Sequence, residues 1–255
     1  MKAVTDELYD LILELQSFNS LQSFALAGGT NLALRYNHRI SFDIDMFSDK
    51  LIGEEGMKLI RDELKQFYKN DFKFAEIINV ESGGQFCFLR MLIIKNGANI
   101  KVELIQNVQH LDPLEIHNKI KLFSEKDIGL FKLLSASNRK AKKDIYDLDF
   151  ITEEIHLSEL LNFLEIKSKK FNDSSCKNLF DLDDELSPLN DLALLLEFDN
   201  IEYTSLPRRP SHSTDRIDIM DQSKPWVLAR SSWKRKVLQV MRERGFALPP
   251  VKPIN

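Results

Sequence analysis

Residues 24–48 constrain the fold of this chain more than any other segment. Residues 24–27 (Phe-Ala-Leu-Ala) form a short apolar run that is typical of a buried strand, and a Gly-Gly-Thr triplet follows at 28–30. Good helix formers continue to Tyr36, so we predict a strand, a glycine turn and a helix in close order. Because glycine has no Cβ atom, phosphate groups can approach the unpaired N–H groups at the start of such a helix.

Two carboxylates stand two positions apart in the next apolar segment, at Asp43 and Asp45. On a strand these two side chains would share one face, while Phe42, Ile44 and Met46 would face a core. Neighbouring carboxylates repel each other unless a cation lies between them, and their hard oxygen atoms suit Mg²⁺ or Mn²⁺. A phosphate cradle followed within about fifteen residues by a metal-binding strand indicates a nucleoside triphosphate site.

Each motif has a plainer explanation when it stands alone, because Gly-Gly-Thr usually marks only a turn and a lone Asp-x-Asp is usually solvated surface. Their order, their spacing and the alternating apolar residues favour the functional interpretation. Haloacid-dehalogenase-like phosphatases and metal-dependent glycosyltransferases also use Asp-x-Asp, but neither class explains the preceding Gly-Gly-Thr. A P-loop kinase is excluded, because the chain has no Gly-x4-Gly-Lys-Ser/Thr motif.

Helical and strand patterns alternate in the first half of the chain, and only helical patterns follow. The predicted helices are 4–17, 54–68, 125–137, 139–152, 157–168, 177–186 and 189–198, and the predicted strands after residue 48 are 72–80, 86–95 and 99–105. Either Asn138 caps the helix at 139–152 or that helix runs on from the one before it. This order predicts an α/β (α+β) fold with a mixed sheet, flanking helices and a helical C-terminal subdomain.

The last fifty residues differ in composition from the rest. Residues 205–255 carry eleven Lys and Arg against four Asp and Glu, although the whole chain has a formal net charge of −4. This basic element either binds RNA or an acidic partner, or is a solvated helix. We predict three regions: an α/β domain over 1–122, a helical subdomain over 123–204, and a basic, proline-containing linker with a helix from Ser231 to Arg244 over 205–255. Ser232 would cap that helix, and Trp233 would dock on the body.

The composition also bears on the compartment. The chain has no apolar run near 18 residues and no secretory stretch after Met1, so we expect no membrane association. Cys87 and Cys176 are expected to be reduced, and the five histidines show no zinc-ligand spacing with cysteines. We therefore expect a cytoplasmic protein.

The motifs together resemble the signature of the AbiEii/AbiGii toxin family, in the minimal-nucleotidyltransferase branch of the DNA polymerase β-like superfamily. The resemblance covers most of residues 20–200 and rests on the Gly-Gly-Thr triplet with Leu32, Leu34, Arg35, His38, Arg39, Ser41, Asp43, Asp45 and Phe47. It implies the toxin of a bacterial type IV toxin–antitoxin (abortive infection) pair. Such an enzyme would transfer a nucleoside monophosphate from an NTP to an RNA, such as tRNA, or to a protein, and would have a cognate antitoxin.

The resemblance also implies roles for particular residues. The implied catalytic residues are Asp43, Asp45, Glu103, Lys132 and Asp144; the implied metal ligands are Asp43, Asp45 and Glu103; and the implied nucleotide-binding residues are Gly28, Gly29, Thr30, Arg39, Ser41 and Lys132. Glu103, which shares a strand face with Lys101, would complete the metal site or accept the proton of the attacking hydroxyl. Lys132 would neutralise the leaving group, and Asp144 would hold the lysine, the ribose or the acceptor. Arg39 and Ser41 would support the metal strand or touch phosphate.

The residues that follow the Asp-x-Asp strand in the chain also have structural explanations. Glu103 with Lys101 can instead be an exposed ion pair, and the charges from Lys132 to Asp147 can be a surface salt-bridge ladder along one helix face. The family cluster usually begins Arg-Asp, whereas Lys143 precedes Asp144 here, and Glu103 replaces a common Asp. The alternative function is therefore a catalytically decayed nucleotide- or partner-binding module.

Overall fold

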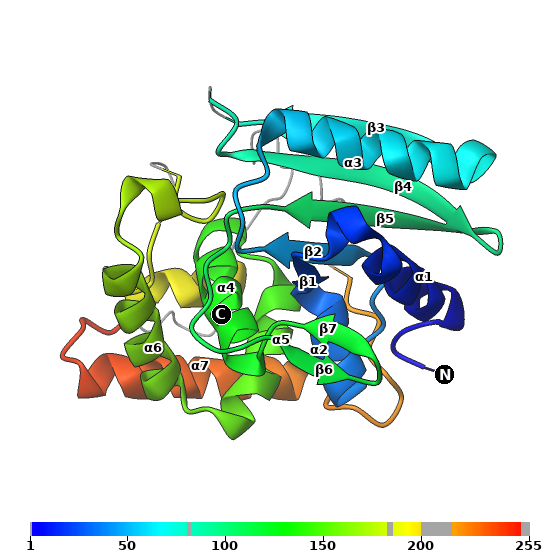
Figure 1. The fold of residues 1–255 in the computed structure, drawn as a ribbon. Coiled ribbons are helices and arrows are strands. Elements are labelled where there is room, and N and C mark those ends of the chain that lie inside the picture. The colour runs from blue at the N-terminus through cyan, green and yellow to red at the C-terminus, as the bar shows by residue number, and fades with distance from the viewer. Residues whose placement is uncertain (1, 81–82, 183–185, 200–215, 251–255) are drawn as a thin grey trace.

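The computed structural model describes residues 2–80, 83–182, 186–199 and 216–250. Within these residues one seven-stranded mixed sheet has the order β3-β4-β5-β2-β1-β7-β6 (Figure 1). Its strands are β1 (Phe24–Leu26), β2 (Ile44–Ser48), β3 (Phe72–Asn79), β4 (Cys87–Lys95), β5 (Ala98–Ile105), β6 (Glu115–His117) and β7 (Ile120–Leu122). In the centre of the sheet, β2 runs antiparallel to β1 and parallel to β5.

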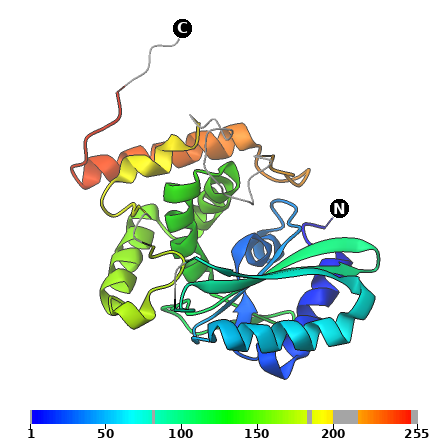
Figure 2. The same ribbon diagram turned by 90° about the horizontal axis from the view of Figure 1, so that it is seen from above.

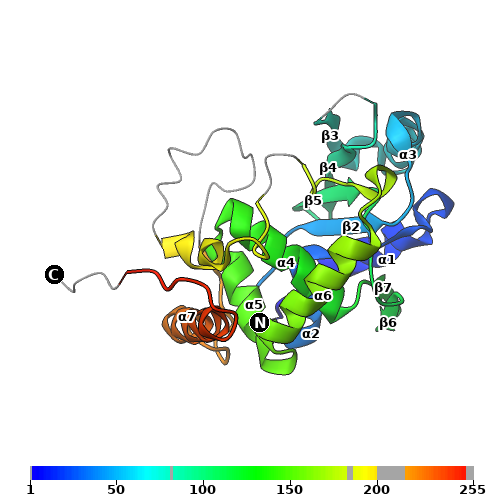
Figure 3. The same ribbon diagram turned by 90° about the vertical axis from the view of Figure 1, so that its left-hand side faces the viewer.

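The helices lie on both faces of this sheet, and those of the second half form a group beside it (Figures 2 and 3). They are α1 (Asp6–Ser17), α2 (Gly28–Tyr36), α3 (Gly53–Tyr68), α4 (Glu125–Arg139), α5 (Lys142–Glu154), α6 (Leu157–Lys170) and α7 (Trp226–Glu243), with short 3₁₀ helices at Asn19–Leu21, Lys69–Asp71, Ser174–Cys176 and Leu192–Asp199. The predicted fold class, a mixed sheet with flanking helices and a helical C-terminal part, is confirmed. No described helix combines the length and the apolar character that crossing a bilayer requires.

Side-chain alternation along β2 separates the two faces. Ile44 and Met46 are fully buried in the core that α1 and α3 form with the sheet. Asp45 and Phe47 point the other way, toward the helical half of the chain, where Phe47 joins a second core with residues of α4 to α7. The strand that was predicted from the Asp-x-Asp pattern therefore presents Asp45 to the junction between sheet and helices.

Phe42 does not face a core, contrary to the prediction. Its side chain is 55% exposed, because β2 begins only at Ile44 and residues 41–43 are not part of the sheet. The strand alternation therefore does not extend back to Phe42.

Several elements differ from the sequence prediction. Strands β6 and β7 were not predicted, because three residues are too few to show a period; β7 is defined by its parallel pairing with β1. Residues 177–182 are not helical, since local bonds such as Asn178 N to Asp181 Oδ2 form turns instead. The last part of the region predicted as a helix at 189–198 is a 3₁₀ helix.

The C-terminal helix begins earlier than predicted. Pro225 is the residue immediately before α7, and Ser232 lies within the helix rather than at its cap. Trp233 does dock on the body, since it is fully buried and its indole N–H donates to the Leu195 carbonyl oxygen at 2.9 Å. Part of the predicted linker (residues 205–215) lies outside the described residues, and residues 218–220 pair with residues 38–40. The three domain boundaries stay a prediction.

Candidate active site

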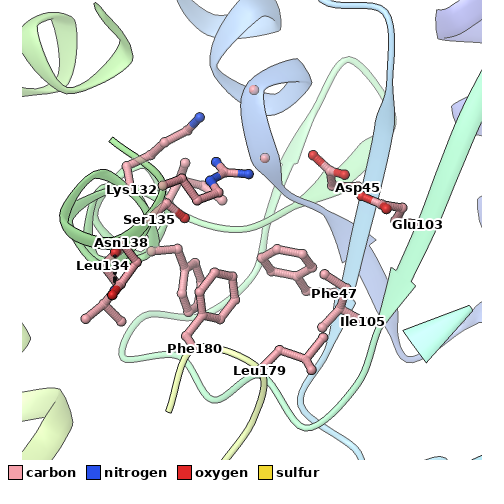
Figure 4. Close-up of a pocket in the computed structure, with 15 residues that line it drawn as sticks. Asp45, Phe47, Glu103, Ile105, Lys132, Leu134, Ser135, Asn138, Leu179 and Phe180 are labelled. Carbon is pink, nitrogen blue, oxygen red and sulfur yellow. Dashed lines mark hydrogen bonds between the residues drawn. The ribbon is translucent and has the colours of Figure 1, made fainter. Parts of the chain in front are cut away.

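Asp45 and Glu103 lie side by side on neighbouring strands. The parallel register of β2 and β5 pairs these two residues directly, and Figure 4 shows both carboxylates on one side of a hollow. Burial, and then the charge of Glu103, raise the pKa of Asp45 to about 7. Burial also acts on Glu103, but the charges of Lys101 and Arg90 outweigh it and lower the pKa of that carboxyl. Two carboxylates thus share a site in which one is strongly disfavoured as an anion.

Two cations contact this carboxylate group. Lys101 Nζ lies 3.3 Å from Asp43 Oδ2 and 3.5 Å from Glu103 Oε2, and Arg90 Nε donates to Glu103 Oε1 at 2.6 Å. The pair of Lys101 with Glu103 is mostly buried, which argues against the alternative of an exposed ion pair. Among the described residues, no cluster of three or more His, Cys, Asp or Glu side chains has the arrangement of a metal site. Arg90 was not predicted as a site residue, although its interruption of an apolar strand was a usable signal.

Gly28 and Gly29 allow charged side chains to pack closely against the start of α2. Gly28 has φ +62°, and a Cβ atom built on it would lie 2.0 Å from Asp45 Oδ2. A Cβ atom on Gly29 would lie 2.3 Å from Arg39 Nη2. Both glycines are therefore required by the close packing of charged side chains against the start of α2.

Replacing Gly28 with Ala is expected to lower nucleotidyl transfer by roughly 10²-fold, because the new methyl group must displace the Asp45 carboxylate. The matched control is Gly53→Ala. Gly53 also has a positive φ, of +73°, but nothing lies within 4 Å of its added Cβ, so this variant carries the backbone strain alone. Equal activities of the two variants, measured as rates of labelled nucleotide transfer, would contradict the expectation.

Hydrogen bonds fasten the segment that leads into β2. The Thr30 hydroxyl is buried, bonds the Asp43 carbonyl oxygen and lies 2.8 Å from Ser41 Oγ. Arg39 forms two bonds to the Asp147 carboxylate, Nε to Oδ1 at 2.6 Å and Nη2 to Oδ2 at 2.7 Å. These bonds favour the supporting role for Arg39 and Ser41 over phosphate contact, and their predicted part in nucleotide binding stays a prediction.

A buried cluster of charges connects α4 and α5 to this segment. Lys132 Nζ lies 2.7 Å from Asp144 Oδ1 and 2.7 Å from Asp147 Oδ2, and Arg139 Nη2 lies 2.8 Å from Asp144 Oδ2. Asp147 also accepts the bonds of Arg39. Burial raises the pKa of Asp144, but the nearby Arg139 and Lys132 outweigh it, so the pKa lies below its usual value. The cluster is a buried ion network and not a surface ladder.

The two helices do not run together, and Asn138 does not cap the second. A break at Lys140, with φ +57°, separates α4 from α5, which begins at Lys142 after Ala141. Asn138 instead lies inside α4 and donates to the Leu134 carbonyl oxygen. The charges therefore meet across a helix pair rather than along one helix face.

Lys143, at the position where the family usually has Arg, differs from its neighbours. It is half-buried, and burial followed by the charge of Arg39 lowers its pKa. Asp43 and Asp218 act on it electrostatically, but within the described part of the chain Lys143 forms no ion pair.

Two hollows meet at the carboxylates. The aromatic hollow (about 210 Å³) is lined by Gly28, Gly29, Asp45, Phe47, Glu103, Ile105, Ile128, Phe131, Lys132, Leu134, Ser135, Asn138, Arg139, Leu179 and Phe180 (Figure 4). The charged hollow (about 140 Å³) is lined by Gly29, Arg39, Ile40, Ser41, Phe42, Asp43, Asp45, Lys101, Glu103, Lys132, Arg139, Ala141, Lys143 and Asp144. Both include Gly29, Asp45, Glu103, Lys132 and Arg139, so the two spaces adjoin where sheet and helices meet.

Stacked rings form the wall of the aromatic hollow. Phe131 and Phe180 lie 5.2 Å apart between ring centroids, and Phe47 contacts both edge-on. Lys132, Ser135 and Asn138 lie opposite Asp45 in Figure 4. Neither Phe131 nor Phe180 was predicted as a site residue, because no local motif marks an aromatic residue as lining a hollow.

Comparison with known proteins decides the family. Residues 13–217 match the family model described as "Nucleotidyl transferase AbiEii toxin, Type IV TA system". The chain belongs to the AbiEii family. This AbiEii protein is accordingly a nucleotidyltransferase of a type IV toxin–antitoxin family, which confirms the resemblance and the enzyme class predicted from the sequence.

Individual relatives of the AbiEii chain are distant. An uncharacterized protein of Aquifex aeolicus (strain VF5), aq_aa25, is 26% identical over 173 residues, which are 67% of this chain and 77% of that protein. The crystal structure of JHP933 from Helicobacter pylori is 15% identical, with a TM-score of 0.48 and 94% of each chain covered. A second H. pylori crystal structure is 16% identical, with a TM-score of 0.47 and 93% and 95% of the chains covered.

Proposed function

We propose that this AbiEii protein transfers a nucleoside monophosphate from an NTP to an RNA acceptor, with Mg²⁺ or Mn²⁺ as cofactor. One observation carries the proposal: Asp45 and Glu103 are paired in register at the point where the aromatic and charged hollows meet. A transfer between two substrates needs one space for each, with the reacting atoms at the boundary. A cognate antitoxin would be the partner of the enzyme.

The proposed divalent cation rests on the chemistry of the carboxylates. Asp43, Asp45 and Glu103 all line the charged hollow, and burial followed by the charge of Glu103 raises the pKa of Asp45, an effect that a bound cation would offset. Oxygen ligands of this kind suit Mg²⁺, which would stabilise the charge that develops on the phosphate oxygens. Lys101 contacts two of the three carboxylates and would have to move aside.

The aromatic hollow fits the nucleoside, and its shared edge fits the phosphates. Phe131 and Phe180 offer an apolar wall for a base, and Gly28 and Gly29 begin α2 with N–H groups that favour anions. Arg139 lines the same edge and its buried Nε has no hydrogen-bond partner within the described residues. A phosphate oxygen would satisfy that donor.

The proposed placement of the substrates implies a reaction. In the proposed reaction the acceptor hydroxyl attacks the α-phosphate and loses its proton to a carboxylate of the group, a role that the family resemblance implies for Glu103. The bond between the α-phosphorus and the bridging oxygen breaks, and pyrophosphate leaves beside Lys132 and Arg139. Asp144 bonds both of these cations and would hold them in place.

The test is incorporation of label from each of the four α-labelled NTPs into total RNA and total protein. Label is expected in RNA with Mg²⁺, and a loss of at least about 10²-fold is expected with EDTA, because metal supplies several kcal/mol of charge stabilisation. Label in protein alone would contradict the proposal that RNA is the acceptor. Unchanged transfer in EDTA would contradict the proposal that a divalent metal is required. Nucleotide binding in calorimetry without any transfer would leave only a decayed binding module.

A further inference from the structure

Phe42 is an exposed aromatic residue at the mouth of the charged hollow. Its side chain is 55% exposed, although it stands between Ser41 and Asp43. Its backbone is held on both sides, because Ser41 N donates to the Ala3 carbonyl oxygen at 2.9 Å and the Asp43 carbonyl oxygen accepts from Thr30. The backbone that carries Phe42 is therefore held in place, and its exposed ring lines the same hollow as the carboxylates without contributing to a core.

Lys143 lines the same hollow and is available for an anion. It projects from the first turn of α5, it is half-buried, and within the residues that the structure describes it makes no ion pair. The other cations of the hollow contact carboxylates, as Lys132 and Arg139 do with Asp144. An ammonium group without such a partner, near an exposed ring, is the combination with which proteins bind single-stranded nucleic acid.

The arrangement of the hollows determines which substrate meets Phe42. An NTP needs an apolar wall for its base, which the aromatic hollow supplies with Phe131 and Phe180. Its triphosphate needs the shared edge at Gly29 and Arg139. The charged hollow beyond this edge then remains for the acceptor.

We propose that Phe42 stacks on the terminal base of a single-stranded RNA 3′ end and that Lys143 contacts the last phosphate of that strand. This inference rests on the proposed function and names the features of the acceptor that the site recognises. A protein acceptor would offer a hydroxyl group but neither a base for Phe42 nor a phosphate for Lys143.

The test is equilibrium binding of a 5′-labelled oligoribonucleotide with an unpaired 3′ end, measured by fluorescence anisotropy with Mg²⁺ and without NTP. Phe42→Ala is expected to weaken binding about tenfold, and Phe42→Trp to retain it, because stacking depends on the ring. Phe74→Ala is the matched control, since Phe74 is 48% exposed on β3 and lines neither hollow. Lys143→Gln is expected to weaken binding and to reduce the dependence on salt.

Steady-state kinetics provide the second readout. Phe42→Ala is expected to raise the KM for RNA about tenfold and to leave the KM for NTP within twofold of wild type. Unchanged RNA binding by Phe42→Ala, equal binding of a blunt duplex, or no binding of RNA by the wild type would each overturn the inference. RNA binding that depends on Phe42 without any nucleotide transfer would instead overturn the proposed function and leave the RNA site in place.

Discussion

Replacing Asp45 with Asn is expected to lower the rate of nucleotidyl transfer by about 10³-fold or more, the largest effect that any single substitution in the site should have. Asn keeps the size of the side chain and so its fit against Gly28, but removes the charge that lies beside Glu103. The measurement is single-turnover transfer of a labelled nucleotide. Asp49→Asn is the control, since Asp49 follows β2 and lines neither hollow.

The same substitution is expected to stabilise the metal-free protein. Because burial and Glu103 raise the pKa of Asp45 from 3.8 to about 7, ionising Asp45 opposes folding. This cost is absent below about pH 4, grows between pH 4 and 7, and is complete above pH 7. Asp45→Asn should therefore raise the free energy of unfolding by up to roughly 4 kcal/mol at pH 8 and change it little at pH 4. An active variant, or one that is less stable at pH 8, would contradict the assignment of Asp45.

Replacing Asp147 with Ala is expected to lower the free energy of unfolding by about 3–5 kcal/mol, the largest stability effect in the site. Asp147 is fully buried and accepts bonds from Arg39, Lys132 and His38, so its removal leaves buried cations without their carboxylate. The measurement is denaturant unfolding at pH 7. Glu55→Ala removes an exposed ion pair with Lys58 and should change stability by no more than about 0.5 kcal/mol.

Acid should reproduce part of this effect. Burial opposes ionisation of Asp147, but the charges of Arg39 and Lys132 outweigh it and hold its pKa well below 3.8. The stabilisation from this group is thus present above about pH 4 and is lost as the pH falls below that value. The stability of Asp147→Asn should depend less on pH in this acidic range, and a variant that unfolds with the same acid profile as the wild type would contradict the role of the cluster.

Much of the fold was predictable because its signals are local. Alternation placed the residues of β2 and β5 on their faces, and helical spacing located α1 and α3 to α6 within a few residues. The short strand β7 was not predicted, because only its pairing with β1 defines it. The early start of α7 was not predicted either, because its first turn carries the exposed apolar residues Val227 and Leu228, which obscured the helical pattern. Residues 177–182 show the opposite error, a helical pattern that side-chain bonds to the backbone overrode.

The sequence by itself determined which residues carry charge beside the glycine turn, because only one helix and one loop separate Gly28 from Asp45. Only the tertiary structure decided that Glu103 stands next to Asp45, since the register of β2 and β5 joins segments that are far apart in the chain. It also decided that Asp147 is a buried anchor for Arg39 and that Phe42 faces solvent. The physical reason is that period and propensity act over a few residues, whereas the partners of a buried charge are chosen by packing across the whole molecule.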